Sequence, residues 1–170
     1  MLNLSLAAVS RGEVRIQGEV SPEDPMWEGT GLALREPLSV DLRARSVGRG
    51  VLVRGPIRMV LDQECRRCLV PVATEVEDTV ELLFEPLEGE AEADELGGEV
   101  YPLPERGGEV DLRPALREQL MLRVPQYVLC REDCRGLCPH CGTDLNRSSC
   151  ACVPEAEPSA WDALKKIKFD

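Results

Sequence analysis

The sequence predicts an α+β protein: an antiparallel β meander or small barrel with a few helices and a C-terminal cysteine-rich tail. Three observations support this fold class. Short runs of alternating apolar and polar residues follow one another through the first half of the chain. A helical pattern begins near residue 111, after the last of these runs. Six of the eight cysteines lie between residues 130 and 152.

Two of the alternating runs lie in the first 50 residues. Residues 14–20 and residues 38–47 each alternate between apolar and polar side chains, so each predicts a strand with one buried face. Residues 21–37, between them, contain three prolines and two glycines. This composition favours irregular structure in the connection.

The next strands follow a turn signal at Gly48-Arg49-Gly50. Residues 51–53 and 57–61 predict two short strands, separated by a break at Gly55-Pro56. Residues 76–84 predict the last strand. Together these runs predict the meander or small barrel.

A helix is predicted at residues 111–122. Asp111 is the expected N-cap, Pro114 lies in the first turn, and Leu116 and Leu120 share one face. Pro125 follows the segment and is expected to end the helix.

The composition indicates a globular protein with an acidic surface. The chain has 170 residues, a mass of 18.8 kDa and 43% hydrophobic residues, which is enough to bury a core. The net charge of −11 argues against a general nucleic-acid coat, because neutralising phosphates requires clustered Lys and Arg. The same charge permits a basic partner, such as a ribosomal protein.

Neither a membrane span nor a secretion signal is expected. No run of about 18 apolar residues is present, which excludes a membrane partner on this criterion. Residues 1–5 lack a basic region followed by an apolar block. We therefore expect a cytoplasmic protein.

An acidic block covers residues 75–111, with 14 acidic residues and one basic residue, Arg106. Its middle, residues 85–98, repeats Glu, Ala and Gly. The simplest interpretation is a solvated loop. The alternatives are a mimic of nucleic acid and a docking site for a basic partner.

The strongest motif is Cys138-Pro139-His140-Cys141-Gly142, followed by Cys150-Ala151-Cys152. In a reducing compartment, close cysteine spacing indicates metal thiolates rather than disulfides. A C-x-x-C turn that ends in glycine is typical of a zinc knuckle, and the second pair completes a tetrahedron around Zn²⁺. Four thiolates leave no position for water. The first predicted site is therefore structural, with the ligands Cys138, Cys141, Cys150 and Cys152.

The four remaining cysteines allow a second zinc site. It would consist of Cys65, Cys68, Cys130 and Cys134, and would tie the β region to the tail. The expected zinc content is therefore one or two ions per chain. The alternatives are a redox dithiol at Cys65/Cys68 and cysteines that bind no metal.

These sites suggest a division of the chain into three parts. They are a β-rich core domain at 1–125 that includes an acidic loop at 85–110, a cysteine-rich zinc-binding segment at 126–153, and a linker with a terminal helix at 154–170. The complete fold prediction is thus an α+β core with a C-terminal zinc-bound cysteine tail.

The sequence offers no catalytic set. His140 is the only histidine, and it lies between two better ligands, so we expect it to be exposed. Neither a Ser/His/Asp set nor a phosphate-binding loop is present. We predict that the protein is not an enzyme and assign no catalytic residue.

Four arginines near the cysteines predict a small basic patch. They either compensate the charge of the thiolates or contact a phosphate of a partner. On the second interpretation the partner-binding residues are Arg66, Arg67, Arg131 and Arg135.

These motifs together resemble the YceD family, whose members are called large ribosomal RNA subunit accumulation proteins. The resemblance rests on Cys65-Arg66-Arg67-Cys68-Leu69, on the segment CREDCRGLCPHCGTDLN at residues 130–146, on Cys150-Ala151-Cys152 and on Trp161-Asp162-Ala163-Leu164-Lys165-Lys166. It covers nearly the whole chain. One departure precedes the last helix, where members usually have Asp-Pro-Arg and this chain has Glu157-Pro158-Ser159.

The resemblance implies a role in the synthesis, processing or stability of large-subunit (23S) ribosomal RNA. Some members keep the equivalents of Cys65 and Cys68 but lack the tail cysteines. The predicted function is a non-enzymatic ribosome biogenesis factor that binds a ribosomal protein, an assembly factor or a pre-ribosomal particle, with direct RNA contact left open. One alternative is a thiol- or zinc-responsive regulatory protein. An RNA-cleaving enzyme is disfavoured, because no acid–base pair is placed.

Overall fold

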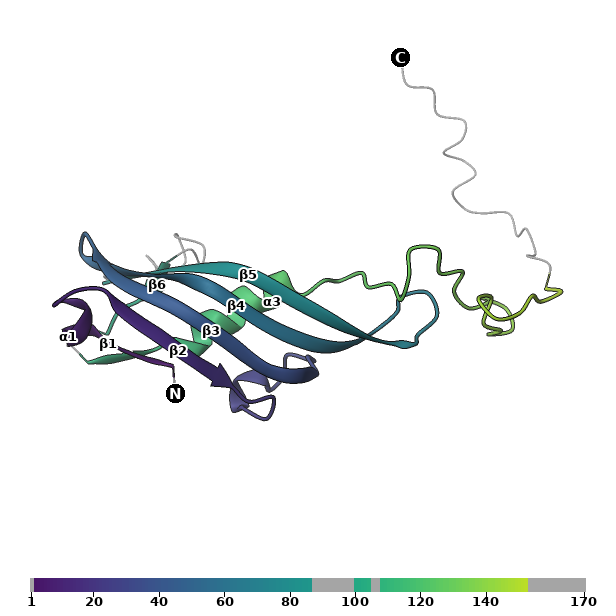
Figure 1. Ribbon diagram of the computed structural model, residues 1–170, viewed down its shortest axis with the longest axis horizontal. Helices are drawn as coiled ribbons and strands as arrows, with labels where there is room; N and C mark the ends of the chain where they lie inside the picture. Colours follow the sequence, from purple (N-terminus) through teal and green to yellow (C-terminus); the bar gives the residue numbers. More distant parts are fainter. Residues whose placement is uncertain (1, 87–99, 105–107, 153–170) are drawn as a thin grey trace, which may run out of the picture.

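The computed structural model describes residues 2–86, 100–104 and 108–152. Its main element is a five-stranded sheet in which each strand from β2 to β5 runs antiparallel to its neighbour, while the short β6 joins β5 in parallel. The four long strands lie side by side in the order of the sequence (Figure 1). The strands are β2 (Val14–Val20), β3 (Leu34–Val47), β4 (Gly50–Glu64), β5 (Pro71–Glu85) and β6 (Val100–Pro102).

The predicted α+β class and the antiparallel meander are confirmed, but the alternative of a small barrel is wrong. The sheet is open, with β2 at one edge and β6 at the other. Strand β2 has the predicted bounds, whereas β3 and β5 begin earlier than predicted. The Gly48-Arg49 turn joins β3 to β4, since Val47 pairs with Gly50.

The predicted break at Gly55-Pro56 is also wrong, because β4 is one continuous strand. On the β3 side, Arg54 pairs with Arg43 and the next paired residue of β4 is Ile57. On the β5 side, Gly55 and Pro56 are both paired. Gly55 permits this arrangement because a Cβ there would lie 2.2 Å from the carbonyl oxygen of Asp41. A glycine and a proline are therefore accommodated where β3 and β4 approach closely.

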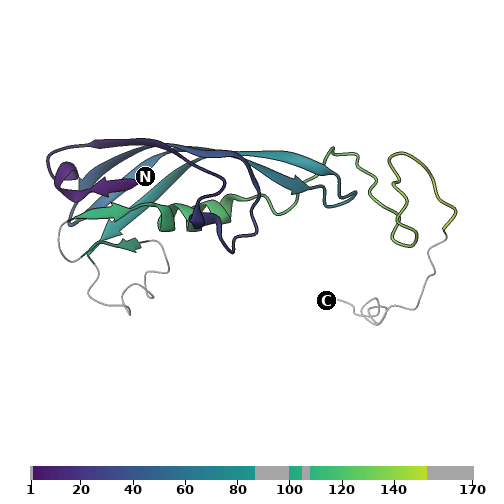
Figure 2. The same ribbon diagram turned by 90° about the horizontal axis from the view of Figure 1, so that it is seen from below.

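A second layer covers one face of the sheet. It contains α1 (Leu6–Val9), the 3₁₀ turn η1 (Pro25–Trp27), helix α3 (Arg113–Arg123) and a two-stranded pairing of β1 (Asn3–Ser5) with β7 (Glu109–Asp111). Figure 2 shows α3 and the β1–β7 pair on the same side of the large sheet. The core lies between the layers. Its fully buried side chains include Leu38, Leu42, Val53, Met59, Leu82, Leu112, Leu116 and Leu120.

Helix α3 differs from its prediction at the N-terminus. Leu112 occupies the N-cap position, and Asp111 belongs to β7 instead. The Asp111 carboxylate nevertheless accepts from the backbone N–H of Arg113 at 3.0 Å and from its guanidinium. The helix ends at Arg123, one residue beyond the predicted end and two residues before Pro125.

The predicted acidic loop at 85–110 contains two short strands, β6 and β7, which no alternation signal reveals because each has three residues. Residues 87–99 and 105–107 lie outside the described residues, as do the predicted linker and terminal helix. Within the described ranges, none of the helices is long and apolar enough to cross a membrane.

Candidate metal centres

The described residues contain two groups of four cysteines, in which all sulfur atoms lie within 4.8 Å of one another. We call the first the hairpin cluster (Cys65, Cys68, Cys130 and Cys134) and the second the tail cluster (Cys138, Cys141, Cys150 and Cys152). The tail cluster is the set predicted from spacing, and the hairpin cluster is the possible second set made of the four remaining cysteines. His140 belongs to neither group and is exposed.

The hairpin cluster is built on the turn between the two longest strands. Strands β4 and β5 pair as far as Glu64 and Pro71, so the Cys65–Cys68 turn closes this hairpin. Within the turn, the Cys65 N–H donates to the Val70 carbonyl and the Leu69 N–H donates to the Cys65 carbonyl, each at 2.9 Å. The other two cysteines come from the tail, which follows α3 and runs past the end of the sheet (Figure 1).

The tail cluster repeats the same hydrogen-bond pattern. The Cys138 N–H donates to the Thr143 carbonyl, and the Gly142 N–H donates to the Cys138 carbonyl, again at 2.9 Å. Both turns are therefore closed by the same two backbone hydrogen bonds. Leu69 and Gly142 each have a positive φ, but the sequence analysis identified only the glycine.

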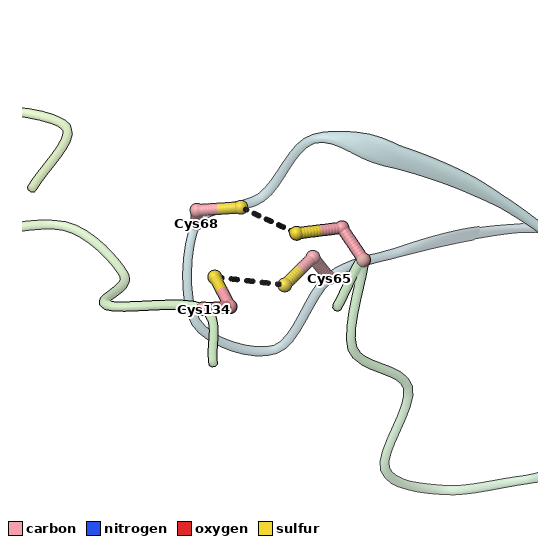
Figure 3. Close-up of side chains that lie close together, drawn as sticks. Cys65, Cys68 and Cys134 are labelled. Atoms are coloured by element: carbon pink, nitrogen blue, oxygen red, sulfur yellow. Dashed lines mark hydrogen bonds between the residues drawn. The ribbon is translucent and has the colours of Figure 1, made fainter. Parts of the chain in front are cut away.

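In the hairpin cluster, the distances between sulfur atoms fit a tetrahedral metal and are too long for disulfide bonds. In the hairpin cluster, the Cys65 and Cys134 sulfurs are 3.8 Å apart, and the Cys68 and Cys130 sulfurs are 3.6 Å apart (Figure 3). A disulfide bond measures about 2.05 Å. Four thiolates at about 2.3 Å from a tetrahedral Zn²⁺ would be about 3.8 Å from one another.

The two clusters differ in exposure. In the hairpin cluster Cys65, Cys68 and Cys134 are buried at 0%, 7% and 2% relative exposure, and only Cys130 is exposed. Apolar side chains surround them, namely Val70, Val72, Leu129 and Leu137. In the tail cluster only Cys138 is buried, while Cys141 and Cys152 are exposed.

The pKa values of Cys65 and Cys130 in the hairpin cluster are shifted in opposite directions. Burial acts to raise the pKa of Cys65, but backbone N–H groups of Cys130, Arg67 and Cys68 outweigh it and lower this pKa to about 6. Although Cys130 as a residue is exposed, desolvation of its thiol, followed by the neighbouring sulfurs of Cys68, Cys134 and Cys65, raises its pKa to about 12. A divalent cation would remove this conflict by stabilising all four thiolates.

The tail cluster shows the same division. The Thr143 hydroxyl, 3.1 Å from the Cys141 sulfur, and the Thr143 backbone N–H lower the pKa of Cys141 to about 6. The nearby Cys141 sulfur, followed by burial, raises the pKa of Cys152 to about 12. Each cluster thus contains one thiol whose pKa is lowered and another whose pKa is raised.

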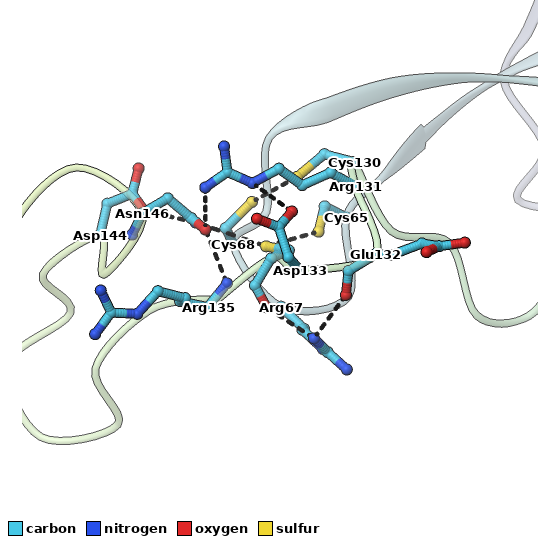
Figure 4. Close-up of polar contacts among 11 residues, drawn as sticks. Cys65, Arg67, Cys68, Cys130, Arg131, Glu132, Asp133, Arg135, Asp144 and Asn146 are labelled. Carbon is cyan, nitrogen blue, oxygen red and sulfur yellow. Dashed lines mark hydrogen bonds and ion pairs between the residues drawn. The ribbon is translucent and has the colours of Figure 1, made fainter.

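Of the four predicted patch arginines, two make side-chain contacts with other described residues. The Arg67 guanidinium donates to the carbonyl oxygen of Cys134 at 2.7 Å, and the Arg67 carbonyl accepts from Leu137 N–H at 2.9 Å. The Arg131 guanidinium contacts Asp133 and Asn146 (Figure 4). Arg66 and Arg135 are exposed, and neither guanidinium forms an ion pair with the part of the chain that the structure describes.

Gly136 explains how closely the tail approaches the hairpin. Its φ is +73°, and a Cβ at this position would lie 2.8 Å from the Arg67 carbonyl oxygen. A side chain would push the tail away from the Cys65–Cys68 turn. The sequence analysis did not single out Gly136 or Asn146, because both act through contacts with residues distant from the cysteine motifs.

The fold and the two clusters define a small sheet protein whose cysteine-rich tail meets its longest hairpin. The family described as "Large ribosomal RNA subunit accumulation protein YceD" matches residues 53–168, which include all eight cysteines. The chain therefore belongs to the YceD family, and the resemblance found in the sequence is confirmed.

Relatives occur in bacteria and plants. An uncharacterized protein of Mycobacterium tuberculosis is 37% identical over 112 residues, covering 64% of this chain and 51% of that protein. A Zea mays protein called large ribosomal RNA subunit accumulation protein YCED homolog 1, chloroplastic, is 30% identical over 156 residues, covering 75% of this chain and 52% of that protein. The chain thus spans about half the length of these curated relatives. No solved structure matches it.

Proposed function

We propose that this protein is a non-enzymatic ribosome biogenesis factor that supports the accumulation or processing of large-subunit (23S) ribosomal RNA. The observation that carries the proposal is membership of the YceD family, supported by the name of the maize relative. The protein acts in the cytoplasm by binding a pre-ribosomal component: a ribosomal protein, an assembly factor or the particle itself.

Zinc in both clusters is part of this proposal. The tetrahedral sulfur spacing and the all-cysteine donor set support Zn²⁺ over harder cations, which prefer oxygen ligands. When bound, Zn²⁺ supplies structural cross-links and no open coordination position. Cys65 and Cys68 then hold the sheet hairpin, and Cys130 and Cys134 attach the tail to it.

A role as a scaffold follows from this chemistry. Four thiolate ligands leave no site for a water nucleophile at either metal. The zinc ions would instead hold the tail, with the exposed Arg66 and Arg135 nearby, in a defined position relative to the sheet. Such a rigid surface suits recognition of another macromolecule.

Depletion and complementation in the native host test the proposal. We expect depletion to lower the ratio of 23S to 16S ribosomal RNA and to accumulate large-subunit precursors in sucrose gradients. Wild-type protein and the exposed-site control Ser148→Ala should restore the profile, whereas Cys65→Ser should not. An unchanged RNA ratio and gradient after depletion would contradict the proposed function.

A second candidate, a thiol-responsive regulator, is favoured by the exposure of Cys141 and Cys152. Oxidants would reach the tail cluster before Cys65 and Cys68, which are buried and therefore suit a structural role. With zinc loaded, Cys65→Ser protein, which retains the tail cluster, should release zinc to hydrogen peroxide faster than Cys150→Ser protein. Equal and slow release from both would speak against this candidate.

A further inference from the structure

One side chain of the tail-cluster loop reaches the hairpin cluster. Asn146 lies between Cys141 and Cys150, yet its side-chain nitrogen Nδ2 donates to the sulfur of Cys134 at 3.6 Å. Its side-chain oxygen Oδ1 accepts from the Arg131 guanidinium and from the Arg135 backbone N–H, both at 2.8 Å (Figure 4). Asn146 therefore contacts the segment that supplies two ligands of the other cluster.

The chemistry around Asn146 determines the orientation of its amide. Its oxygen faces two donors, Arg131 and Arg135, and its nitrogen faces two acceptors, the Cys134 sulfur and the Asp144 carboxylate at 2.8 Å. A flipped amide would place oxygen against both acceptors and nitrogen against both donors. The hydrogen bond to the sulfur is thus specified by three other contacts.

The loop that carries Asn146 is attached to the chain between the clusters. The Leu145 N–H donates to the Gly136 carbonyl at 2.9 Å, and Leu137 forms a β-bridge with Asp144. Asp144 also accepts from the Asn146 backbone N–H at 2.9 Å. The position of the Asn146 amide therefore depends on the same loop that closes the tail cluster.

We propose that Asn146 is a positioning residue that couples metal binding at the two clusters. This inference rests on the proposed zinc sites and goes beyond them, because two separate structural zincs would need no communication. An N–H···S hydrogen bond stabilises the Cys134 thiolate and orients it toward a metal. Metal in the tail cluster orders the loop, supplies this hydrogen bond and raises the affinity of the hairpin cluster.

The coupling is reciprocal and has a defined size. If metal in the tail cluster raises the metal affinity of the hairpin cluster by a given factor, metal in the hairpin cluster raises the metal affinity of the tail cluster by the same factor. Removing an outer hydrogen bond to a metal ligand typically weakens metal binding about 10- to 100-fold. We expect a change in this range when Asn146 is truncated.

The test uses the full chain loaded with Co²⁺, whose charge-transfer absorption reports on thiolate ligands, and with Zn²⁺ in chelator competition. Four proteins form a cycle: wild type, Asn146→Ala, Cys138→Ser with Cys141→Ser, and the triple variant. Asn146→Ala and the double cysteine variant should each weaken the hairpin cluster about tenfold or more. The triple variant should be no weaker than the double variant, because both changes remove the same contact.

Two further variants separate positioning from general structure. Asn146→Asp keeps an acceptor for Arg131 and Arg135 but removes the donor to Cys134, so it should weaken the hairpin cluster and shift its Co²⁺ charge-transfer band. Ser149→Ala, at an exposed residue of the same loop, should change neither the affinity nor the band. Circular dichroism checks that each variant retains the sheet.

The outcomes distinguish the two proposals. Suppose that wild-type protein binds two ions and that the variant Cys138→Ser with Cys141→Ser binds metal at the hairpin cluster as tightly as wild type does. This result overturns the coupling but leaves the two zinc sites standing. An unshifted band in Asn146→Asp, with wild-type affinity, also overturns it. Wild-type protein that takes up neither Co²⁺ nor Zn²⁺ overturns the zinc sites and the coupling together.

Discussion

Leu69 and Gly142 occupy the same position in the two cysteine turns, although one carries a large side chain and the other carries none. Each donates its backbone N–H to the first cysteine of its pair at 2.9 Å, with φ angles of 59° and 72°. A residue with a Cβ pays about 1–2 kcal/mol in this region. The paired strands β4 and β5 hold Leu69 there, whereas Gly142 adopts the conformation without strain.

Gly142→Ala should therefore weaken metal binding at the tail cluster by about 5- to 30-fold, the equivalent of about 1–2 kcal/mol. The effect is one of backbone conformation alone, because nothing lies within 4 Å of the added Cβ. Chelator competition on the Cys65→Ser background measures it. The reverse control is Leu69→Gly in the Cys150→Ser variant, where the hairpin cluster remains. It should bind metal at least as tightly as the Cys150→Ser variant itself. Unchanged affinity in Gly142→Ala would show that the turn relaxes at no cost.

Removing one ligand from each cluster should have different structural effects. Both Cys65→Ser and Cys150→Ser should lower the zinc content to one ion per chain at saturating metal. Only Cys65→Ser should release the tail from the sheet, because Cys65 and Cys68 are the ligands that belong to the hairpin. Mass spectrometry counts the zinc, and limited proteolysis after Pro125 detects the released tail. Rapid cleavage in Cys150→Ser but not in Cys65→Ser would reverse this assignment.

The close approach of β3 and β4 predicts that Gly55 tolerates no side chain. In Gly55→Ala the Asp41 carbonyl must move from a position 2.2 Å away from the new Cβ, so the unfolding free energy should fall by about 2–3 kcal/mol. Denaturant unfolding of zinc-loaded protein measures the change. Thr79→Ala, at the exposed residue opposite Pro56, should stay within about 0.5 kcal/mol of wild type. A wild-type midpoint for Gly55→Ala would disprove the tight approach.

Gly55 also shows which parts of the fold the sequence could reveal. Strand β2 was predictable to the residue because alternation is a local signal, and the tail cluster was predictable from cysteine spacing. The hairpin cluster could be offered only as one option for the four remaining cysteines, because its two pairs lie far apart in the sequence. The continuity of β4 was not predictable, because Gly55-Pro56 resembles a strand break in the sequence. Only the neighbouring strands β3 and β5 show that the strand continues there. Strands β6 and β7 are too short for periodicity. Asn146 depends on contacts between two loops, which no single motif specifies.

The four arginines near the hairpin cluster differ in what they can offer to a partner. All four arginines are exposed, but the guanidinium groups of Arg67 and Arg131 already contact the tail. Within the described residues, Arg66 and Arg135 therefore have the guanidinium groups that are free to contact a phosphate. Two arginines release few counterions, and the net charge of −11 repels RNA. Each zinc with four thiolates would add a further local charge of −2.

We therefore expect weak binding to protein-free 23S ribosomal RNA at physiological salt, and tighter binding to a fraction that contains basic ribosomal proteins. Because attraction between opposite charges is screened, association with this fraction should slow as salt rises. Titrations across salt concentrations measure both. The test protein is the double variant Arg66→Ala with Arg135→Ala. The control is the double variant Arg43→Ala with Arg45→Ala, whose residues lie on the exposed face of β3. If naked RNA binds tightly to wild type, and only the first pair of substitutions abolishes that binding, the arginines beside the hairpin cluster are an RNA contact and the protein-partner argument fails.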